Sequence, residues 1–325
     1  MIEVSALCKH YGTTVAVADL TFEAKPREIL GFLGPNGAGK TTTLRMISGA
    51  LGPTRGTIRV AGHDLMEEPM RARQCLGYMP EAAPLYPELR VDEFLLFRAA
   101  LKGVAARQQK ATVLEVMRKT NLEDFAQVTI AHLSKGYRQR VAFADALIAK
   151  PPVYILDEPT AGLDPNQIRE TRALIRALGS EHTVVVSSHI LSEIEELCDR
   201  ALVIHHGHVV AAGTIDELRQ GTGASAAFAA VVRDPKQMSP AICRELLGIA
   251  RVKAQDDGAG VLRLTIDIAS GHNRDTVCEE LVRRWVAAGI GVLGVEPKAV
   301  RLEDIFAALT NEASAAAMKS KEGSR

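Results

Sequence analysis

One segment of the sequence, Gly34-Pro-Asn-Gly-Ala-Gly-Lys-Thr41, has the residue types and spacing of a phosphate-binding loop. It matches G-x-x-x-x-G-K-[ST], follows an apolar run at 28–33 that reads as a strand, and precedes helical character at 41–48. Glycines allow a concave loop whose N–H groups face phosphates, and the helix N-terminus adds a partial positive charge. We expect Lys40 to reach the β- and γ-phosphates and Thr41 to bind Mg²⁺. Without ligand, we expect Lys40 to face solvent.

Two adjacent carboxylates, Asp157 and Glu158, follow a second apolar run at 153–156. Beside a phosphate loop, Asp157 would anchor the metal, either directly or through its hydration shell. Glu158 lies one residue further on, where it can orient or deprotonate an attacking water. The alternative is a solvated acidic strand end, which the phosphate loop upstream makes much less plausible.

The elements that must position these groups predict an α/β domain. Strand-like and helix-like segments alternate over the first two hundred residues, and the runs at 28–33, 153–156 and 183–187 have the almost continuous apolar character of buried parallel strands. Residues of about 92–148 contain no comparable strand, and their apolar side chains recur at helical spacing. We therefore predict a helical insert, with Phe94 and Phe97 in its core.

The texture changes after residue 220, where Gly221-Thr-Gly-Ala-Ser reads as a linker. Beyond it, the order strand, helix, strand, strand, helix, strand predicts a small α+β domain of the ferredoxin-like type. The expected organisation is a nucleotide-binding domain at 1–220, this C-terminal domain with a last amphipathic helix (302–309) at 221–312, and a disordered tail at 313–325.

Composition limits the class of protein. The 325 residues carry 39 basic and 39 acidic side chains, with 47% hydrophobic and 24% charged residues, as in ordinary globular proteins. The balanced charge disfavours a nucleic-acid partner. We find no secretory signal and no apolar run of the roughly 18 to 20 residues that span a bilayer. Five scattered cysteines favour free thiols in a reducing compartment, so we expect a cytoplasmic protein.

An ordered series of further motifs identifies a family. The segment Leu133-Ser-Lys-Gly-Tyr-Arg-Gln-Arg140 precedes Asp157, and Ala161-Gly-Leu-Asp164 and Ser188-His189 follow it. Together with the phosphate loop, these motifs resemble the nucleotide-binding subunits of ATP-binding-cassette (ABC) transporters over residues of about 2–220. The resemblance implies a P-loop NTPase cassette with a helical insert, using ATP and Mg²⁺, in which two subunits pack head to tail.

The resemblance also assigns roles to residues of this chain. Each ATP would lie between one phosphate loop and a signature segment of the opposite subunit that should begin a helix. Glu158 and His189 would be catalytic, His189 by contacting the γ-phosphate, and Asp164 would couple the two ATP sites. Tyr11 would stack on adenine, the alternative being an ordinary packed tyrosine. The implied ATP-binding loop is Gly34, Pro35, Asn36, Gly37, Ala38, Gly39, Lys40, Thr41 and Thr42, and the implied signature is Ser134, Lys135, Gly136 and Tyr137.

Three positions depart from the common family pattern. Lys135 replaces a glycine, Tyr137 replaces a glutamine, and Glu81 stands where a glutamine usually senses Mg²⁺. Glu81 can still be an oxygen ligand of the metal or accept a hydrogen bond from the attacking water. These variants resemble the exporter-type subgroup that includes gliding-motility, antibiotic-resistance and copper-processing ATPases.

The leading hypothesis is therefore the ATPase subunit of a membrane exporter, acting as a dimer, most simply a homodimer, on the cytoplasmic face of the membrane. Its partners would be separately encoded transmembrane subunits, and apolar groups near Leu85 and Tyr86 would help receive one of their helices. The alternative is a soluble ABC ATPase that acts on nucleic acid or the ribosome. A single phosphate loop, the absence of a long coiled-coil insertion and the zero net charge count against that alternative. Glu158 and His189 argue against a binding switch without turnover.

Overall fold

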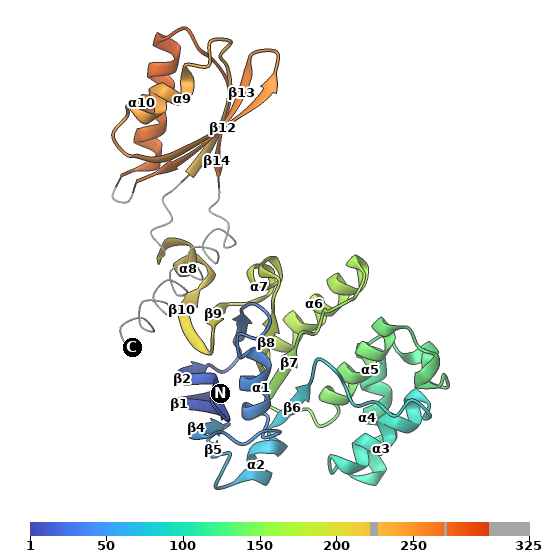
Figure 1. The fold of residues 1–325 in the computed structure, drawn as a ribbon. Coiled ribbons are helices and arrows are strands. Elements are labelled where there is room, and N and C mark those ends of the chain that lie inside the picture. The colour runs from blue at the N-terminus through green and yellow to red at the C-terminus, as the bar shows by residue number, and fades with distance from the viewer. Residues whose placement is uncertain (222–226, 270–271, 299–325) are drawn as a thin grey trace. The chain divides into compact units, whose positions relative to one another are not determined.

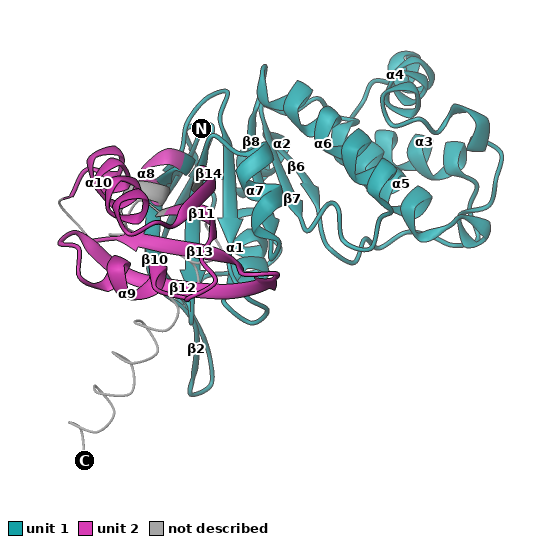
Figure 2. Cartoon of the chain, turned by 90° about the horizontal axis from the view of Figure 1, so that it is seen from above, with its two compact units in different colours: residues 1–215 teal, residues 216–325 magenta. Residues whose placement is uncertain are grey.

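The computed structural model describes residues 1–221, 227–269 and 272–298, and its contacts divide the chain into two compact units, Met1–Ile215 and Asp216–Arg325 (Figures 1 and 2). Residues 222–225 of the expected linker, the helix expected at 302–309 and the tail at 313–325 lie outside the described residues, whereas Gly221, the first residue of that linker, ends a helix. Within the described residues, no helix combines the length and apolar character needed to cross a membrane.

A six-stranded sheet forms the centre of the first unit (Figure 1). Its strand order is β10-β9-β3-β8-β7-β6, and all neighbours are parallel except β10 and β9. Every residue of β3, β7 and β8 is buried, which explains their continuous apolar runs. Its strands are β3 (Ile29–Leu33), β6 (Leu76–Met79), β7 (Val153–Asp157), β8 (Thr183–Ser188), β9 (Arg200–His205) and β10 (His208–Thr214).

A second, antiparallel sheet of order β2-β1-β4-β5 contributes to the same core. Its strands are β1 (Ile2–Tyr11), β2 (Thr14–Ala24), β4 (Arg55–Val60) and β5 (His63–Asp64). The rings of Phe22 on β2 and Phe32 on β3 meet edge to face, with centroids 5.2 Å apart. Outside the helical insert, the helices of this unit include α1 (Lys40–Ile47), α2 (Pro69–Gln74), α6 (Pro165–Gly179) and α7 (Leu191–Leu197). This core fixes the carboxyl ends of β3, β7 and β8, where the predicted motifs lie.

The helical insert extends from the β6 edge of the central sheet (Figure 1). It contains α3 (Val91–Leu101), α4 (Ala106–Lys119), the 3₁₀ turns η1 (Glu123–Phe125) and η2 (Ile130–His132), and α5 (Lys135–Leu147). Phe94 is 2% exposed, as predicted. The prediction for Phe97 was wrong: it is 43% exposed and packs against the equally exposed Tyr86, with ring centroids 5.8 Å apart. Both positions suit a helical face, so spacing alone could not distinguish core from surface.

The second unit has the predicted order of elements. Helix α8 (Ile215–Gly221) leads into a four-stranded antiparallel sheet of order β12-β13-β11-β14, which is the ferredoxin-like arrangement (Figure 2). Trp285 on α10 is fully buried in this unit's own hydrophobic core, and its indole Nε1 donates to the Ser239 carbonyl at 3.4 Å. The elements are β11 (Ala227–Arg233), α9 (Ser239–Arg244), β12 (Ile249–Gly258), β13 (Val261–Ile268), α10 (Arg274–Ala287) and β14 (Gly291–Lys298).

Because Trp285 is the only tryptophan of the chain, its fluorescence reports unfolding of the second core alone. We expect Mg·ATP to raise the denaturation midpoint followed by circular dichroism, since ligand binding stabilises the unit that binds it. The fluorescence midpoint should not move. In the control variant Lys40→Ala, neither midpoint should respond to nucleotide. Equal shifts of both signals in the parent protein would show that the two units unfold together.

Candidate functional site

The phosphate loop joins β3 to α1 and has the backbone geometry that its glycines predict. Gly39 precedes α1 with a φ of 107°, a conformation that side-chain-bearing residues rarely adopt. A Cβ on Gly34 would lie 2.3 Å from the carbonyl oxygen of Ile204. The main-chain N–H of Gly207, in the β9–β10 turn, donates to the Ala38 carbonyl at 2.9 Å. The loop is therefore supported from behind by the neighbouring strand pair.

Lys40 lies inside the loop and not in solvent, so our expectation of a solvent-facing lysine was wrong. It is 5% exposed, and its Nζ donates to the carbonyls of Gly34 (2.6 Å) and Pro35 (3.3 Å). Its Nζ also lies 3.5 Å from Glu158 Oε1. A buried ammonium needs such partners because it has lost its hydration. The structure thus keeps the lysine charge paired at the place where phosphates are expected.

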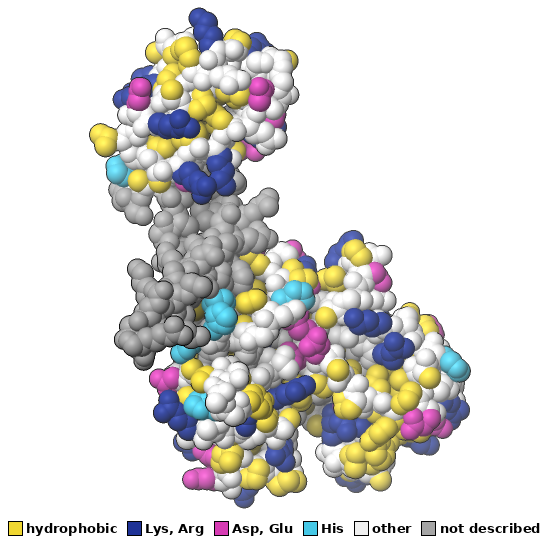
Figure 3. All heavy atoms as spheres, viewed as in Figure 1, with side chains coloured by type: hydrophobic (Ala, Val, Ile, Leu, Met, Phe, Trp, Pro, Cys, Tyr) yellow, Lys and Arg dark blue, Asp and Glu magenta, His cyan; other side chains and the backbone are white. Residues whose placement is uncertain are grey.

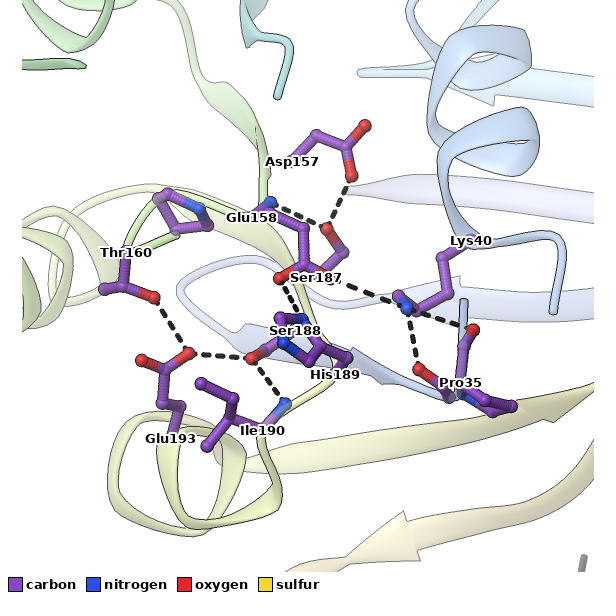
Figure 4. A network of polar contacts seen from close by, with 12 residues as sticks. Pro35, Lys40, Asp157, Glu158, Thr160, Ser187, Ser188, His189, Ile190 and Glu193 are labelled. Carbon is purple, nitrogen blue, oxygen red and sulfur yellow. Dashed lines mark hydrogen bonds and ion pairs between the residues drawn. The ribbon is translucent and has the colours of Figure 1, made fainter. Parts of the chain in front are cut away.

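Glu158 is held from four directions, three of which, from Ser187, His189 and Lys40, appear in Figure 4. Its main-chain N–H donates to Ser187 Oγ at 2.9 Å, and the Nδ1 atom of His189 lies 2.8 Å from its Oε2. Its Oε1 faces Lys40, and its carbonyl accepts from Gln139 Nε2 at 3.3 Å. The residue has a φ of 50°, the left-handed conformation that is costly for a non-glycine residue. Its carboxylate therefore has a fixed position at the end of β7.

Asp157 lies beside Thr41 and Ser187 and is completely buried. Its Oδ1 accepts from Ser187 Oγ at 2.6 Å and from Thr41 Oγ1 at 3.3 Å, whereas its Oδ2 has no hydrogen-bond partner among the described residues. Burial raises the pKa of Asp157, the two hydroxyl hydrogen bonds oppose that rise, and the charges of Glu81 and Glu158 add to it. The site therefore holds a carboxylate in conditions that disfavour its charge.

Lys40, Thr41 and Glu158 line one cavity of about 810 Å³ including its open mouth, within the roughly 300–1,000 Å³ typical of ligand sites. Gly34 and Asp157 are not among the described residues that line it. The cavity gathers the phosphate loop with three residues that are distant in sequence, Glu81, Glu158 and His189. On the face drawn in Figure 3, acidic side chains and a histidine gather beside the hollow between the central sheet and the helical insert. The described residues that line the cavity are Ala16, Pro35, Asn36, Gly37, Ala38, Gly39, Lys40, Thr41, Thr42, Glu81, Glu158, Ala161 and His189.

Three predicted groups lie elsewhere. Tyr11, at the end of β1, is not among the described residues that line the cavity; it is 51% exposed, and Lys9 Nζ lies 5.4 Å from its ring centroid. Asp164 caps α6 by accepting from the N–H groups of residues 166 and 167 at 3.0 Å. The signature residues 134–137 are likewise absent from the described lining of this cavity.

The signature does begin a helix, as predicted. Ser134 is the N-cap of α5, and its hydroxyl accepts from the Tyr137 N–H at 3.4 Å. The Tyr137 ring packs on Phe125 with centroids 3.9 Å apart. Ser134 and Lys135 are exposed and Gly136 is buried, and the main-chain N–H groups of this helix start have a geometry that suits an anion.

The sequence reasoning missed a set of polar residues behind His189. Glu193 Oε2 accepts from Thr160 Oγ1 at 2.8 Å and from Ser188 Oγ at 2.7 Å, and Ser188 Oγ in turn accepts from the Ile190 N–H at 3.0 Å (Figure 4). Glu193 is only 4% exposed. These bonds tie the segment after β7 to the segment after β8. A glutamate on the apolar side of α7 was the available signal, but its partner Thr160 lies in a segment that is distant in sequence.

Comparisons with known proteins agree with this geometry. Residues 17–161 match the family model described as ABC transporter. The chain is 33% identical over 313 residues to the linearmycin resistance ATP-binding protein LnrL of Bacillus subtilis (strain 168), covering 95% of this chain and 98% of that protein. It is also 33% identical over 312 residues to the daunorubicin resistance ATP-binding protein DrrA3 of Streptomyces coeruleorubidus, covering 96% of each.

Solved structures show the same likeness. The ATP-binding subunit of an ABC transporter superposes with a TM-score of 0.64 at 34% identity, over 69% of this chain and 93% of that one. A dimeric ATP-binding cassette in a post-hydrolysis state, bound to ADP and Pi, superposes with a TM-score of 0.62 at 25% identity, over 66% of this chain and 99% of that one. The chain belongs to the ATP-binding proteins of ABC transporters. It is an ATPase subunit that powers transport and binds nucleotide in the cassette.

The burial of the Asp157 carboxylate leads to a prediction about thermal stability. Its folded pKa lies above the ordinary value of 3.8, so the ionised carboxylate destabilises the nucleotide-free fold at high pH, and this cost disappears as the carboxyl becomes protonated. Asp157→Asn should therefore raise the melting temperature of the nucleotide-free protein by a few degrees near pH 8, with a smaller gain near pH 5.

Calorimetry at the two pH values measures this difference. Asp64→Asn is the matched control, because the Asp64 carboxylate accepts from main-chain N–H groups outside the cavity and an asparagine oxygen can replace it. An Asp157→Asn variant that melts below the parent at both pH values would contradict the prediction.

Proposed function

We propose that the cavity binds Mg·ATP and hydrolyses it with Glu158 as the group that activates water, and that this turnover drives an exporter. The proposal is carried by one observation: the phosphate loop, Glu158 and His189 line a single cavity. A carboxylate beside the γ-phosphate position can accept a water proton or orient the water, and His189, next to it, can contact that phosphate.

The residues of the site fit a magnesium ion. Asp157 has a buried Oδ2 without a hydrogen-bond partner among the described residues, and the Thr41 hydroxyl donates to the other oxygen of the same carboxylate. Glu81, which lines the cavity with Thr41, is a further oxygen ligand for the metal. Mg²⁺ prefers oxygen ligands, and it would neutralise the charge that burial and Glu81 make costly at Asp157. When bound, Mg²⁺ supplies positive charge to the phosphate oxygens. Thr41, Asp157 and Glu81 are the side chains that would hold it or its water shell.

Nucleotide binding would redistribute the contacts of Lys40. In the structure, the ammonium divides its interactions between two loop carbonyls and Glu158. Phosphates in the loop offer a stronger charge partner. As Lys40 turns to them, Glu158 Oε1 is released toward the space where water would attack, while Oε2 stays with His189. The carboxylate is thus paired until substrate is present.

The exposed helix start at Ser134 supports a head-to-tail dimer. Residues 134–137 do not line their own cavity in the described chain, so a second copy must supply them to the γ-phosphate if they act there. We propose a homodimer, in which Tyr11 stacks on adenine and Asp164 lies between the two sites.

Separately encoded transmembrane subunits would bind the helical insert on the cytoplasmic face of the membrane. Tyr86 and Phe97 are each 43% exposed, and Leu101 is 62% exposed, which leaves an apolar surface on α3 and the segment before it. The relatives named for linearmycin and daunorubicin resistance favour an exporter over a soluble factor that acts on nucleic acid. On the face drawn in Figure 3, basic and acidic side chains are interspersed, which also favours this choice.

The central test is Glu158→Gln. It should keep ATP affinity, lower kcat by about 10²–10⁴-fold because glutamine cannot accept the proton, and trap an ATP-bound dimer visible by size-exclusion chromatography. Lys40→Ala is the control that should lose tight nucleotide binding. Hydrolysis by Glu158→Gln at close to the parent rate would exclude Glu158 as the base.

A second test concerns the unusual Glu81. Its negative charge contributes to raising the pKa of Asp157, so the empty site should depend more strongly on metal than a site with glutamine would. Glu81→Gln should retain ATP binding, require less Mg²⁺ for half-maximal ATPase activity, and weaken stimulation by the membrane partner more than basal hydrolysis. Matched Mg²⁺ titrations of parent and variant measure this, and superimposable curves would remove Glu81 from the metal site.

A further inference from the structure

The left-handed backbone of Glu158 requires support, because that conformation costs on the order of 1–3 kcal/mol in a non-glycine residue. Part of the support comes from a residue in the helical insert. Gln139 Nε2 donates to the carbonyls of Glu158 (3.3 Å) and Pro159 (3.1 Å). Because both partners are acceptors, the side-chain amide must present its NH₂ group to them. The remaining bond to the Glu158 carbonyl is the local turn from the Ala161 N–H at 3.1 Å.

Gln139 belongs to the same helix as the signature. It lies one helical turn after Lys135, so both side chains project from one face of α5. That face fits closely against residues 158–167. A Cβ on Gly162 would lie 2.2 Å from Lys135 Nζ, and a Cβ on Gly136 would lie 2.2 Å from Gln167 Oε1. The missing side chains of these two glycines therefore allow the helix start to approach the segment that follows Glu158.

We infer that Gln139 is a positioning residue for hydrolysis. It holds the Glu158 main chain so that the carboxylate points into the cavity, and it connects the signature helix of a subunit to that subunit's own ATP site. When the signature of one subunit binds a γ-phosphate, α5 and Gln139 would therefore transmit that contact to the position of Glu158 in the same chain. The assignment rests on the proposed role of Glu158, and its test separates the two.

The surroundings of Gln139 allow a clean substitution. The side chain is half-buried beside a small cavity that is also lined by Lys119, Arg140 and Glu170. These charges already have partners: Arg140 lies 2.6 Å from Glu170, and Lys119 lies 3.1 Å from Glu115. In the described chain, the atoms that receive the Gln139 amide are the two carbonyls alone.

Gln139→Ala should lower kcat by about tenfold, since the loss of both Gln139 hydrogen bonds and a small displacement of a reacting group are each costly. ATP affinity and the KM for ATP should not change, because the phosphate loop is untouched. The matched control is Gln109→Ala. Gln109 Nε2 donates to the Val104 carbonyl at 3.0 Å in the same helical insert, far along the chain from Glu158, and its loss should leave kcat unaltered.

Gln139→Glu provides a readout that a merely structural role would not give. The ionised carboxylate cannot donate and repels the two carbonyl oxygens, whereas the protonated form can donate one hydrogen bond. Its kcat relative to the parent should therefore rise as the pH falls from about 8.5 to about 6. We expect protonation in this range because partial burial beside two acceptors raises the pKa of the new carboxyl group. The relative kcat of Gln139→Ala should stay flat over the same range.

Steady-state ATPase assays of the full chain, with melting temperatures and ATP affinities measured in parallel, decide the matter. The inference is overturned if Gln139→Ala turns over at the parent rate, or if the relative kcat of Gln139→Glu does not depend on pH. Lack of ATPase activity in the parent, or full activity of Glu158→Gln, would instead remove the proposed function. Parent activity, an inactive Glu158→Gln and the predicted behaviour of both Gln139 variants together support the inference.

Discussion

The ion pair between Lys40 and Glu158 joins the phosphate loop to the acidic end of β7, and the central sheet places these two groups next to each other. Lys40 begins α1 after β3, and Glu158 follows β7, with β8 between the two strands in the sheet. Parallel strands bring their carboxyl ends to one edge, which is where ligands bind in sheets of this kind. The buried apolar strands thus set the distance between an ammonium and a carboxylate that are more than a hundred residues apart in sequence.

The two neighbouring carboxylates differ in how completely their polar atoms are paired. Every polar group of Glu158 has a partner, whereas Asp157 is buried with one oxygen unpaired and two other carboxylates nearby. Such an arrangement costs stability without ligand and gains it when a cation enters. Nucleotide, together with the proposed magnesium ion, would therefore stabilise this part of the fold when it binds.

Local sequence signals were sufficient for β3, β7 and β8, for the phosphate loop and for the order of elements in the second unit. The glycines before Lys40 and the apolar run that ends in Asp157 are short-range patterns, and each forms the predicted loop or strand in the structure. The burial of Lys40 and the exposure of Phe97 could not be predicted, because each depends on groups brought close only by tertiary contacts. The same holds for Gln139, whose partners follow β7, and for the hydrogen bond from Thr160 to Glu193, which joins segments that are distant in sequence. The antiparallel sheet of order β2-β1-β4-β5 likewise needed long-range pairing of β1 with β4.

The support of the phosphate loop by Gly207 has a consequence for how this region can vary. The contacts are made by main-chain atoms: the Gly207 N–H donates to Ala38, and the Gly207 carbonyl accepts from the Ala18 N–H at 2.9 Å. With a φ of 80°, and the Ala16 carbonyl 2.8 Å from where a Cβ would stand, Gly207 itself has little freedom to change. Its neighbours His206 and His208 are exposed, and the bonds that support the loop do not involve their side chains. The two histidines of the turn can therefore be substituted without removing the main-chain hydrogen bonds that support the phosphate loop. Substitution of Gly207 itself would disturb those bonds.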